Sequence, residues 1–456
     1  MSAVGGPRKP KGGSDLSNRR RPNVLLIVVH DLGTRLGCCG ETSVRTPALD
    51  TLAQEGVRFD SNFATACFCS PSRGSIITGK HPHINGLMGL VNLDWDLPDG
   101  NATLAQMLGA AGYETYLFGL QHEVKDVGRL GFHHVSDRSV RNECHTVAGQ
   151  VADFLRSMGN KERPFYARVG FFEVHRPWGK YEPDDPADVH VPGHLTDTPG
   201  ARRDLAMFHG AIRSMDAAVG SILAALDESG SRDDTLLVFT TDHGIAFPRA
   251  KATLYDPGIN TALLMRWPAG FPGGRVYDEL LSNVDLVPTL LEAAGTPAPD
   301  DLSGRSFLSL LQGRGYEPNG EIFAEKNTSP NDIKRCIRTQ RYKYIRNYNE
   351  GPLLQLPTDI EASLTRQQMG DEHLAPRPEV ELYDLEADPP ETENLAGRPD
   401  HTDIERRLAS RLERFQETTG DPIIRGPIER PPGEAEIVRR NRERAERRKA
   451  ELERGG

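Results

Sequence analysis

Short apolar runs that alternate with helical patterns constrain the fold of this chain most strongly, because that order is typical of layered α/β proteins. The first run, Val24–Val29, contains only β-branched residues and Leu, as expected for a strand that is buried on both faces. Similar runs predict strands at 113–118, 165–172, 236–240 and 262–267. Between Ala201 and about Asp227, apolar residues repeat on one face and predict a long helix. We therefore expect an α/β fold with a large, mixed but mostly parallel sheet between helices.

The chain of 456 residues is long enough for one large domain and a smaller one. We expect a disordered basic leader at 1–21 and the α/β domain at 22–318. Short strands and turns then predict a small C-terminal antiparallel α+β subdomain at 319–426, in which residues 351–377 form a long loop. The Glu- and Arg-rich segment 427–456 is expected to be a charged tail that forms a solvated, frayed helix.

The composition argues against several functions and locations. A net charge of −10 disfavours a general role in binding nucleic acid. No run approaches the roughly 20 apolar residues that a membrane helix needs, so we expect no membrane segment. The six cysteines include the crowded pairs Cys38-Cys39 and Cys67/Cys69. Such crowding is unlike a disulfide framework, so we expect a reducing, cytoplasmic setting.

Each of four predicted strands is followed by titratable side chains. In chain order these are His30 and Asp31, then His122, then Glu173 and His175, and finally Asp242 and His243. In doubly wound sheets, ligands bind beyond the carboxyl ends of the strands, so these side chains are expected to meet. The carboxylates of such a set favour Ca²⁺ or Mg²⁺, whereas the imidazoles favour Mn²⁺, Zn²⁺ or other transition ions.

A second candidate site is the segment Cys69-Ser70-Pro71-Ser72-Arg73. Pro71 favours the start of a helix, which places Cys69 just before a helix N-terminus that stabilises anions. Arg73 offers a forked cation to a sulfate, a phosphate or an oxidised Cys69 side chain. A buried structural cysteine beside a surface arginine fits the same residues, and the two interpretations stay open on these grounds alone. A zinc cluster with the Cys38-Cys39 pair is disfavoured, because the spacing matches no structural zinc pattern.

The motif Cys69-x-Pro71-x-Arg73 resembles the signature of type I sulfatases, whose cysteine is oxidised to formylglycine (3-oxoalanine). The segment from Gly112-Tyr113-x-Thr115 to His122 resembles their second signature, and the likeness extends from about Pro22 to Leu395. Segments 201–206, 213–220 and 234–258 resemble in particular the heparan N-sulfatase (sulfamidase) branch. The resemblance implies the alkaline-phosphatase-like sulfatase fold and hydrolysis of a sulfate ester or sulfamate, on a sulfated sugar.

The resemblance also implies one divalent metal ion, Ca²⁺ in the family. Asp31, Asp242 and His243 take the positions of metal ligands, together with the formylglycine made from Cys69. His30 stands where the family usually has a ligand Asp, and His243 where it usually has Asn. Two imidazoles make the ligand set less anionic and softer, so Mn²⁺, Mg²⁺ and Zn²⁺ stay open.

The catalytic roles that the resemblance implies fall on five further side chains. Arg73 is expected to bind the formylglycine, and His122 to assist its hydrated form. His175 and Lys251 are expected to bind the sulfate and to protonate the leaving group. Arg176 is a candidate for binding an anionic part of the substrate. The implied partners are a small-molecule or saccharide sulfate and a formylglycine-generating enzyme, and a homodimer stays open.

One more departure affects the function. Leu120 replaces a Lys that normally contacts the sulfate, and this loses a charged hydrogen bond. Two alternatives to a sulfatase therefore remain. One is a phosphodiester or phosphonate monoester hydrolase of the same superfamily that uses Mn²⁺ or Zn²⁺. The other is a non-catalytic, anion-binding relative.

Overall fold

The computed structural model describes residues 21–136, 143–158, 163–441 and 443. Nearly all of the predicted leader and the end of the predicted tail lie outside the described residues. The central sheet has eight strands in the order β5-β4-β6-β1-β7-β8-β2-β9. Their bounds are β1 Asn23–Val29, β2 Val57–Phe59, β4 Glu114–Gly119, β5 His134–Val135, β6 Phe165–Gly170, β7 Thr235–Thr241, β8 Leu263–Arg266 and β9 Arg275–Tyr277.

The sheet is mixed but mostly parallel, as predicted. The pairs β4–β5, β4–β6, β1–β6, β1–β7 and β2–β9 are parallel, whereas β8 runs antiparallel to β7 and to β2. The four strands predicted to lead into titratable residues are neighbours in the order β4-β6-β1-β7. Their carboxyl ends therefore lie side by side at one edge of the sheet.

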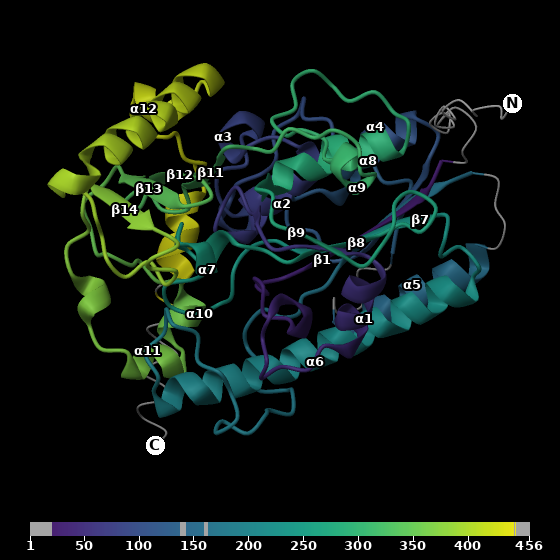
Figure 1. Ribbon diagram of the computed structural model, residues 1–456, viewed down its shortest axis with the longest axis horizontal. Coiled ribbons are helices and arrows are strands. Elements are labelled where there is room, and N and C mark those ends of the chain that lie inside the picture. Colours follow the sequence, from purple (N-terminus) through teal and green to yellow (C-terminus); the bar gives the residue numbers. More distant parts are fainter. Residues whose placement is uncertain (1–20, 137–142, 159–162, 442, 444–456) are drawn as a thin grey trace, which may run out of the picture.

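Two layers of helices cover the sheet (Figure 1). On one side lie α1 (Pro47–Glu55), α5 (Cys144–Met158) and the long α6 (Pro199–Glu228). On the other lie α2 (Cys69–Thr78), α4 (Leu104–Ala110), α8 (Leu286–Ala293) and α9 (Leu308–Leu311). The alternating side chains of β1 pack into both layers, with Leu25 and Ile27 toward α6 and Leu26 and Val28 toward α8. This two-sided burial explains the continuous apolar run of β1.

A second, antiparallel sheet of four strands follows, in the order β11-β12-β13-β14. The strands are β11 Ile322–Lys326, β12 Lys334–Arg338, β13 Tyr342–Asn347 and β14 Val380–Asp384. Helix α12 (Thr402–Thr419) packs against this sheet through Leu408 and Leu412. Short elements complete the fold: β3 Asn62–Phe63, β10 Leu281–Ser282, α3 Pro82–Asn85, α7 Asp256–Ile259, α10 Thr358–Glu361 and α11 Leu364–Gln368.

Three expectations are corrected by the structure. Residues 351–377 are not one long loop, because they contain α10 and α11, and α11 packs on α6. Both helices are too short for intrinsic propensity to stabilise or to reveal them. Helix α2 begins at Cys69 itself, not after it.

The third correction concerns the start of the segment 427–456, which is not simply solvated. Glu434 is buried and accepts a hydrogen bond of 3.1 Å from Trp95 Nε1, and Arg430 lies over the Trp95 ring. This indole hydrogen bond and ring contact hold the segment against the large domain.

None of the described helices is long and apolar enough to cross a membrane.

The central strand provides a test of the core. Leu26 is fully buried in β1 between two neighbouring strands, whereas Val276 on the edge strand β9 is 55 % exposed. We expect Leu26→Ala to lower the free energy of unfolding by about 2–5 kcal/mol, because it leaves a cavity. Val276→Ala should change it by less than about 0.5 kcal/mol. Urea unfolding followed by circular dichroism measures both, and equal effects would contradict this description of the core.

Candidate active site

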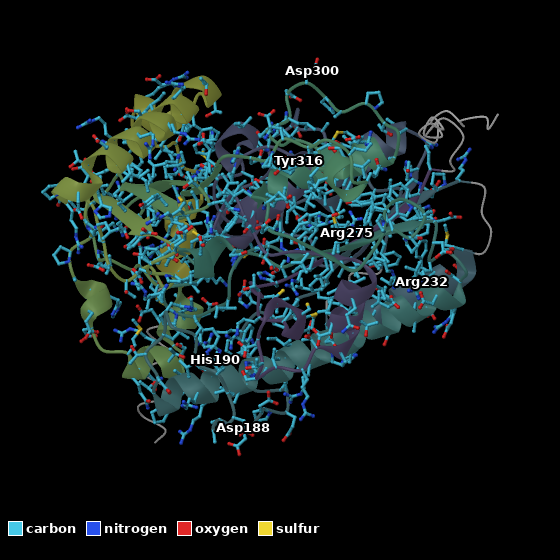
Figure 2. All side chains as sticks on the ribbon, in the orientation of Figure 1. Asp188, His190, Arg232, Arg275, Asp300 and Tyr316 are labelled. Atoms are coloured by element: carbon cyan, nitrogen blue, oxygen red, sulfur yellow. The ribbon has the colours of Figure 1, made fainter. Side chains whose placement is uncertain are left out.

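The polar residues that follow the central strands form one buried cluster. Asp31, just beyond β1, and Asp242, just beyond β7, are both fully buried, and His30 and His243 lie beside them. Exposed charged groups such as Asp188 and Asp300 project instead from the outside of the molecule (Figure 2). The predicted meeting of the strand ends is therefore confirmed for the side chains of this buried cluster. It is wrong for Glu173, whose carboxylate instead accepts hydrogen bonds from the backbone N–H of Cys144 at 2.8 Å and the hydroxyl of Tyr181 at 2.6 Å.

The two aspartates are held by a dense set of donors. Asp242 accepts hydrogen bonds from Arg73 Nε at 2.9 Å and from the backbone N–H groups of Asp31 and His243 at 3.0 and 2.9 Å. Asp31 Oδ2 lies 2.7 Å from Lys251 Nζ, and its Oδ1 lies 2.7 Å from His30 Nδ1. Asp31 has φ 53°, a left-handed conformation that these contacts help to maintain.

His243 is oriented by its own loop. Its Nδ1 donates to the carbonyl of Gly244 at 2.9 Å, so Nε2 points away from the loop, 3.1 Å from Asp31 Oδ1. Among the described residues this buried Nε2 has no hydrogen-bond partner. A side chain at Gly244 would place Cβ 1.8 Å from the carbonyl oxygen of Pro257, so this turn requires glycine.

The charges of the cluster favour a cation in its centre. Burial lowers the pKa of His30, but Asp242 and Asp31 outweigh it and raise that pKa to about 10. Burial likewise opposes a charged His243, whose pKa the same carboxylates nevertheless raise. Positive charge among the imidazoles is therefore stabilised, whether a proton or a metal ion carries it. This electrostatic environment fits a divalent metal, and so does His243 Nε2, which faces Asp31 Oδ1 without making a hydrogen bond among the described residues.

The spacing of the donor atoms fits one ion as well. One ligand atom each from His30, Cys69, Asp242 and His243 lie within 4.8 Å of one another, and so do atoms from His30, Asp31 and His175. Ligands at about 2.0–2.4 Å from a common metal have such separations. Spacing therefore makes His30, Cys69, Asp242 and His243 one candidate ligand set, and it groups Asp31 with His30 and His175. The assignment of His30, Asp31, Cys69, Asp242 and His243 as ligands of one metal stays a prediction.

Cys69 is the first residue of α2 and is buried against this cluster. Burial disfavours the thiolate, but the charge of His30 and the neighbouring imidazoles of His122, His243 and His30 hold the pKa of the Cys69 thiol well below its ordinary value. The structure thereby brings His122 to Cys69. An anionic or polarised group at this position is stabilised by its neighbours.

Arg73 lies one turn further along α2 and is completely buried. Besides Asp242, it donates through Nη2 to the carbonyl of Val29 at 3.0 Å. Its Nη1 has no hydrogen-bond partner among the described residues. A buried guanidinium with one free donor is suited to bind an anion.

A second group joins Lys251, His175 and a residue that the sequence analysis missed. Lys251 Nζ lies 2.7 Å from Asp31 Oδ2, 3.2 Å from His175 Nε2 and 3.2 Å from Asp359 Oδ2. Asp359 belongs to α10, inside the segment expected to be a loop. No motif marks it, and it is far from Lys251 in the chain, so no signal in the sequence indicates this contact.

Arg176 is the one predicted site residue that does not face the cluster. Its guanidinium pairs with buried Asp204 at 3.2 and 3.3 Å and donates to the carbonyl of Ala246 at 2.9 Å. It also lies 3.9 Å above the Trp178 ring. The charge of Arg176 is therefore used inside the protein, and its predicted role in binding substrate gains no support from these contacts.

The fold and the cluster at the strand ends define an alkaline-phosphatase-like hydrolase. Residues 22–296 match the family described as Sulfatase, and residues 244–362 match the one described as N-sulphoglucosamine sulphohydrolase, C-terminal. The chain belongs to the sulfatase family. The predicted resemblance to the sulfatases and their sulfamidase branch is confirmed, and so is the predicted fold class.

Proteins of similar sequence support the family assignment, and solved proteins of similar structure support the fold. Human N-sulphoglucosamine sulphohydrolase is 29 % identical over 90 % of this chain and 93 % of its own length. A solved protein in complex with its substrate D-glucosamine-2-N,6-O-disulfate superposes with a TM-score of 0.70 at 20 % identity, covering 88 % of this chain and 99 % of that one. A phosphonate monoester hydrolase from Silicibacter pomeroyi also has a TM-score of 0.70, at 21 % identity, covering 88 % and 96 %. The two structures show that the fold is shared.

The metal site can be tested without measuring catalysis. We expect Asp242→Asn to weaken binding of a divalent metal by at least about 10-fold, because it removes a negative ligand and loosens Arg73. Exposed Asp300 provides the control, Asp300→Asn. Elemental analysis after dialysis against each metal and the metal-dependent rise in melting temperature measure the effect. Equal metal content in both variants and the native protein would contradict this site.

Proposed function

We propose that this sulfatase hydrolyses a sulfate ester or sulfamate carried on a sugar, and that it uses a divalent metal ion and a nucleophile made from Cys69. The single observation that carries the proposal is the buried contact between the start of α2, with Cys69 and Arg73, and the acidic cluster of Asp31 and Asp242. That arrangement combines an oxidisable side chain, a free cationic donor and a metal-binding set in one place. A non-catalytic relative has no need for all three together.

Each side chain has a role that follows from its position. The metal would be held by Asp31, Asp242 and His243, with His30 and residue 69 completing the set. Formylglycine at position 69 would supply a hydroxyl nucleophile once hydrated, made more acidic by the metal. His122, which contacts residue 69, is placed to take a proton from that hydroxyl.

The sulfate would bind between the cations that surround the cluster. Arg73 Nη1 is a free donor on the side of α2, and Lys251 provides an ammonium on the opposite side of Asp31. His175 donates through Nδ1 to the carbonyl of Arg176 at 2.6 Å, which directs its Nε2 to Lys251. These groups stabilise charge on the sulfate oxygens as the bond to the leaving atom breaks.

The identity of the metal is proposed from the ligand types. Ca²⁺ is the ion that the family resemblance implies, but His30 and His243 supply two nitrogen donors. Imidazole ligands suit Mn²⁺ and Zn²⁺ better than Ca²⁺. We expect Mn²⁺ or Zn²⁺ to support activity at least as well as Ca²⁺.

A sugar substrate is supported by sequence similarity. The match of 244–362 to the sulphoglucosamine sulphohydrolase family includes Lys251 and Asp359 of this site.

The proposed cytoplasmic location is supported by the six cysteines, all of which are free. A formylglycine-generating enzyme is proposed as a partner because members of the sulfatase family need their cysteine oxidised.

The nucleophile provides the test. Protein co-produced with a formylglycine-generating enzyme should release inorganic sulfate from a panel of sugar sulfates and sulfamates, and the peptide that contains residue 69 should be lighter than its unmodified form. We expect Cys69→Ala to lower kcat/KM by at least ~10³-fold, because it removes the nucleophile. The control Cys39→Ala changes a half-buried cysteine that is not part of the buried cluster, and this variant should retain activity.

The same preparation separates the alternatives. Faster turnover of aryl phosphonates than of the matched aryl sulfates with Mn²⁺ or Zn²⁺ would overturn the sulfatase proposal in favour of phosphonate hydrolysis. An unmodified Cys69 peptide and no sulfate release from any substrate would instead indicate a binding protein.

A further inference from the structure

Asp359 approaches the site from a different part of the chain than the other charged groups. It lies on α10, on the side of the molecule that carries the small sheet (Figure 1). Its Oδ2 is 3.2 Å from Lys251 Nζ and 3.9 Å from His175 Nε2. The Asp359 side chain is 23 % exposed, whereas that of Asp31, on the other side of Lys251, is fully buried. Asp359 is thus the carboxylate on the open side of the Lys251–His175 pair.

The three donors of Lys251 are all in use. An ammonium has three N–H groups, and here they face Asp31, His175 and Asp359. A sulfate that binds to Lys251 must therefore displace one of these acceptors. Asp359 is more exposed than Asp31 and at 3.2 Å is bound less closely than Asp31 at 2.7 Å. We therefore expect the Asp359 carboxylate to release Lys251 when the substrate binds, so that a free carboxylate oxygen faces the substrate.

The chemistry of the leaving atom decides what such a carboxylate favours. A carboxylate only accepts hydrogen bonds. The nitrogen of a sulfamate carries an N–H whose hydrogen bond the carboxylate can accept. The bridging oxygen of a sulfate ester carries no hydrogen and repels the carboxylate. When the S–N bond breaks, its electron pair goes to nitrogen, the sulfuryl group goes to the nucleophilic oxygen, and nitrogen takes a proton from Lys251 and leaves as an amine. Both leaving atoms gain negative charge as the bond breaks, but nitrogen keeps an N–H that a carboxylate can accept, whereas a departing ester oxygen has none until it is protonated.

We propose that Asp359 is a specificity-determining residue that accepts the N–H of a sulfamate substrate and thereby favours N-sulfate over O-sulfate at this site. This inference rests on the proposed function. It adds that the leaving atom is nitrogen rather than oxygen, which the proposed function does not specify. A positioning role, in which Asp359 only holds Lys251, is the competing explanation. Loss of a specificity role affects turnover of the N-sulfate only, whereas loss of a positioning role affects the N-sulfate and the O-sulfate equally.

The test uses two sugars that differ only at the leaving atom, glucosamine 2-N-sulfate and glucose 2-O-sulfate. We expect the native enzyme to prefer the N-sulfate. Asp359→Asn and Asp359→Ala should lower kcat/KM for the N-sulfate by roughly 10–100-fold, the loss of one charged hydrogen bond. Turnover of the O-sulfate should stay unchanged or rise. Glu361→Gln, an exposed acid on the same helix, should change neither substrate.

Several outcomes would overturn the inference. Equal losses for both substrates would assign Asp359 to positioning, and native turnover of the O-sulfate alone would exclude it while leaving the sulfatase function intact. Absence of sulfate release from both sugars and from the whole panel would remove the proposed function too. Binding of inorganic sulfate, measured by calorimetry, provides an independent readout. Removing the Asp359 charge should leave that affinity unchanged or raise it, whereas weaker binding would indicate that Asp359 only holds Lys251.

Discussion

The ion pair between Arg73 and Asp242 is the contact on which the site depends. Both side chains are fully inaccessible to solvent, and Nε and Oδ2 are 2.9 Å apart. Buried charges are tolerated only when they are paired and hydrogen-bonded, so this pair fixes α2 against the end of β7. Because Cys69 lies one turn before Arg73, the same pair holds residue 69 against the acidic cluster. The position of residue 69 is therefore set by a buried charge pair, and neither partner can leave it without a large loss of stability.

The order of the central strands turns this local contact into a complete site. The strands β4, β6, β1 and β7 are neighbours and parallel, so residues that follow them meet although the chain separates them widely. The resulting concentration of negative charge is balanced from two directions. Arg73 supplies positive charge from α2, and Lys251 from the loop beyond β7. The imidazoles of His30 and His243 are held between these charges, where a cation is stabilised.

Much of this arrangement could be predicted from the sequence. The parts that could not be predicted all have the same cause. The apolar runs indicated the central strands, and the residues behind them indicated the site. No continuous apolar run indicates strand β12, because Lys334 and Arg335 are charged. They are buried only because acidic partners from distant segments pair with them. Helices α10 and α11, and with them Asp359, are stabilised by contacts such as Thr365 Oγ1 to Asp204 at 2.8 Å. The pairing of Arg176 with Asp204 is of the same kind. Tertiary partners, which no local pattern reveals, decide all of these cases.

The two sides of the site are built in different ways, and this has a consequence for specificity. The candidate metal ligands Asp31 and Asp242 follow strands of the central sheet, whose side chains are buried on both faces, and Cys69 begins helix α2, which packs against them. Asp359, the proposed determinant of the leaving atom, lies instead on a four-residue helix that is held by tertiary contacts, and its side chain is partly exposed. A substitution on that helix changes the charge near the leaving atom without disturbing the Arg73–Asp242 pair. On this proposal the reaction and the choice of substrate are separable, because different segments of the chain carry the groups assigned to each.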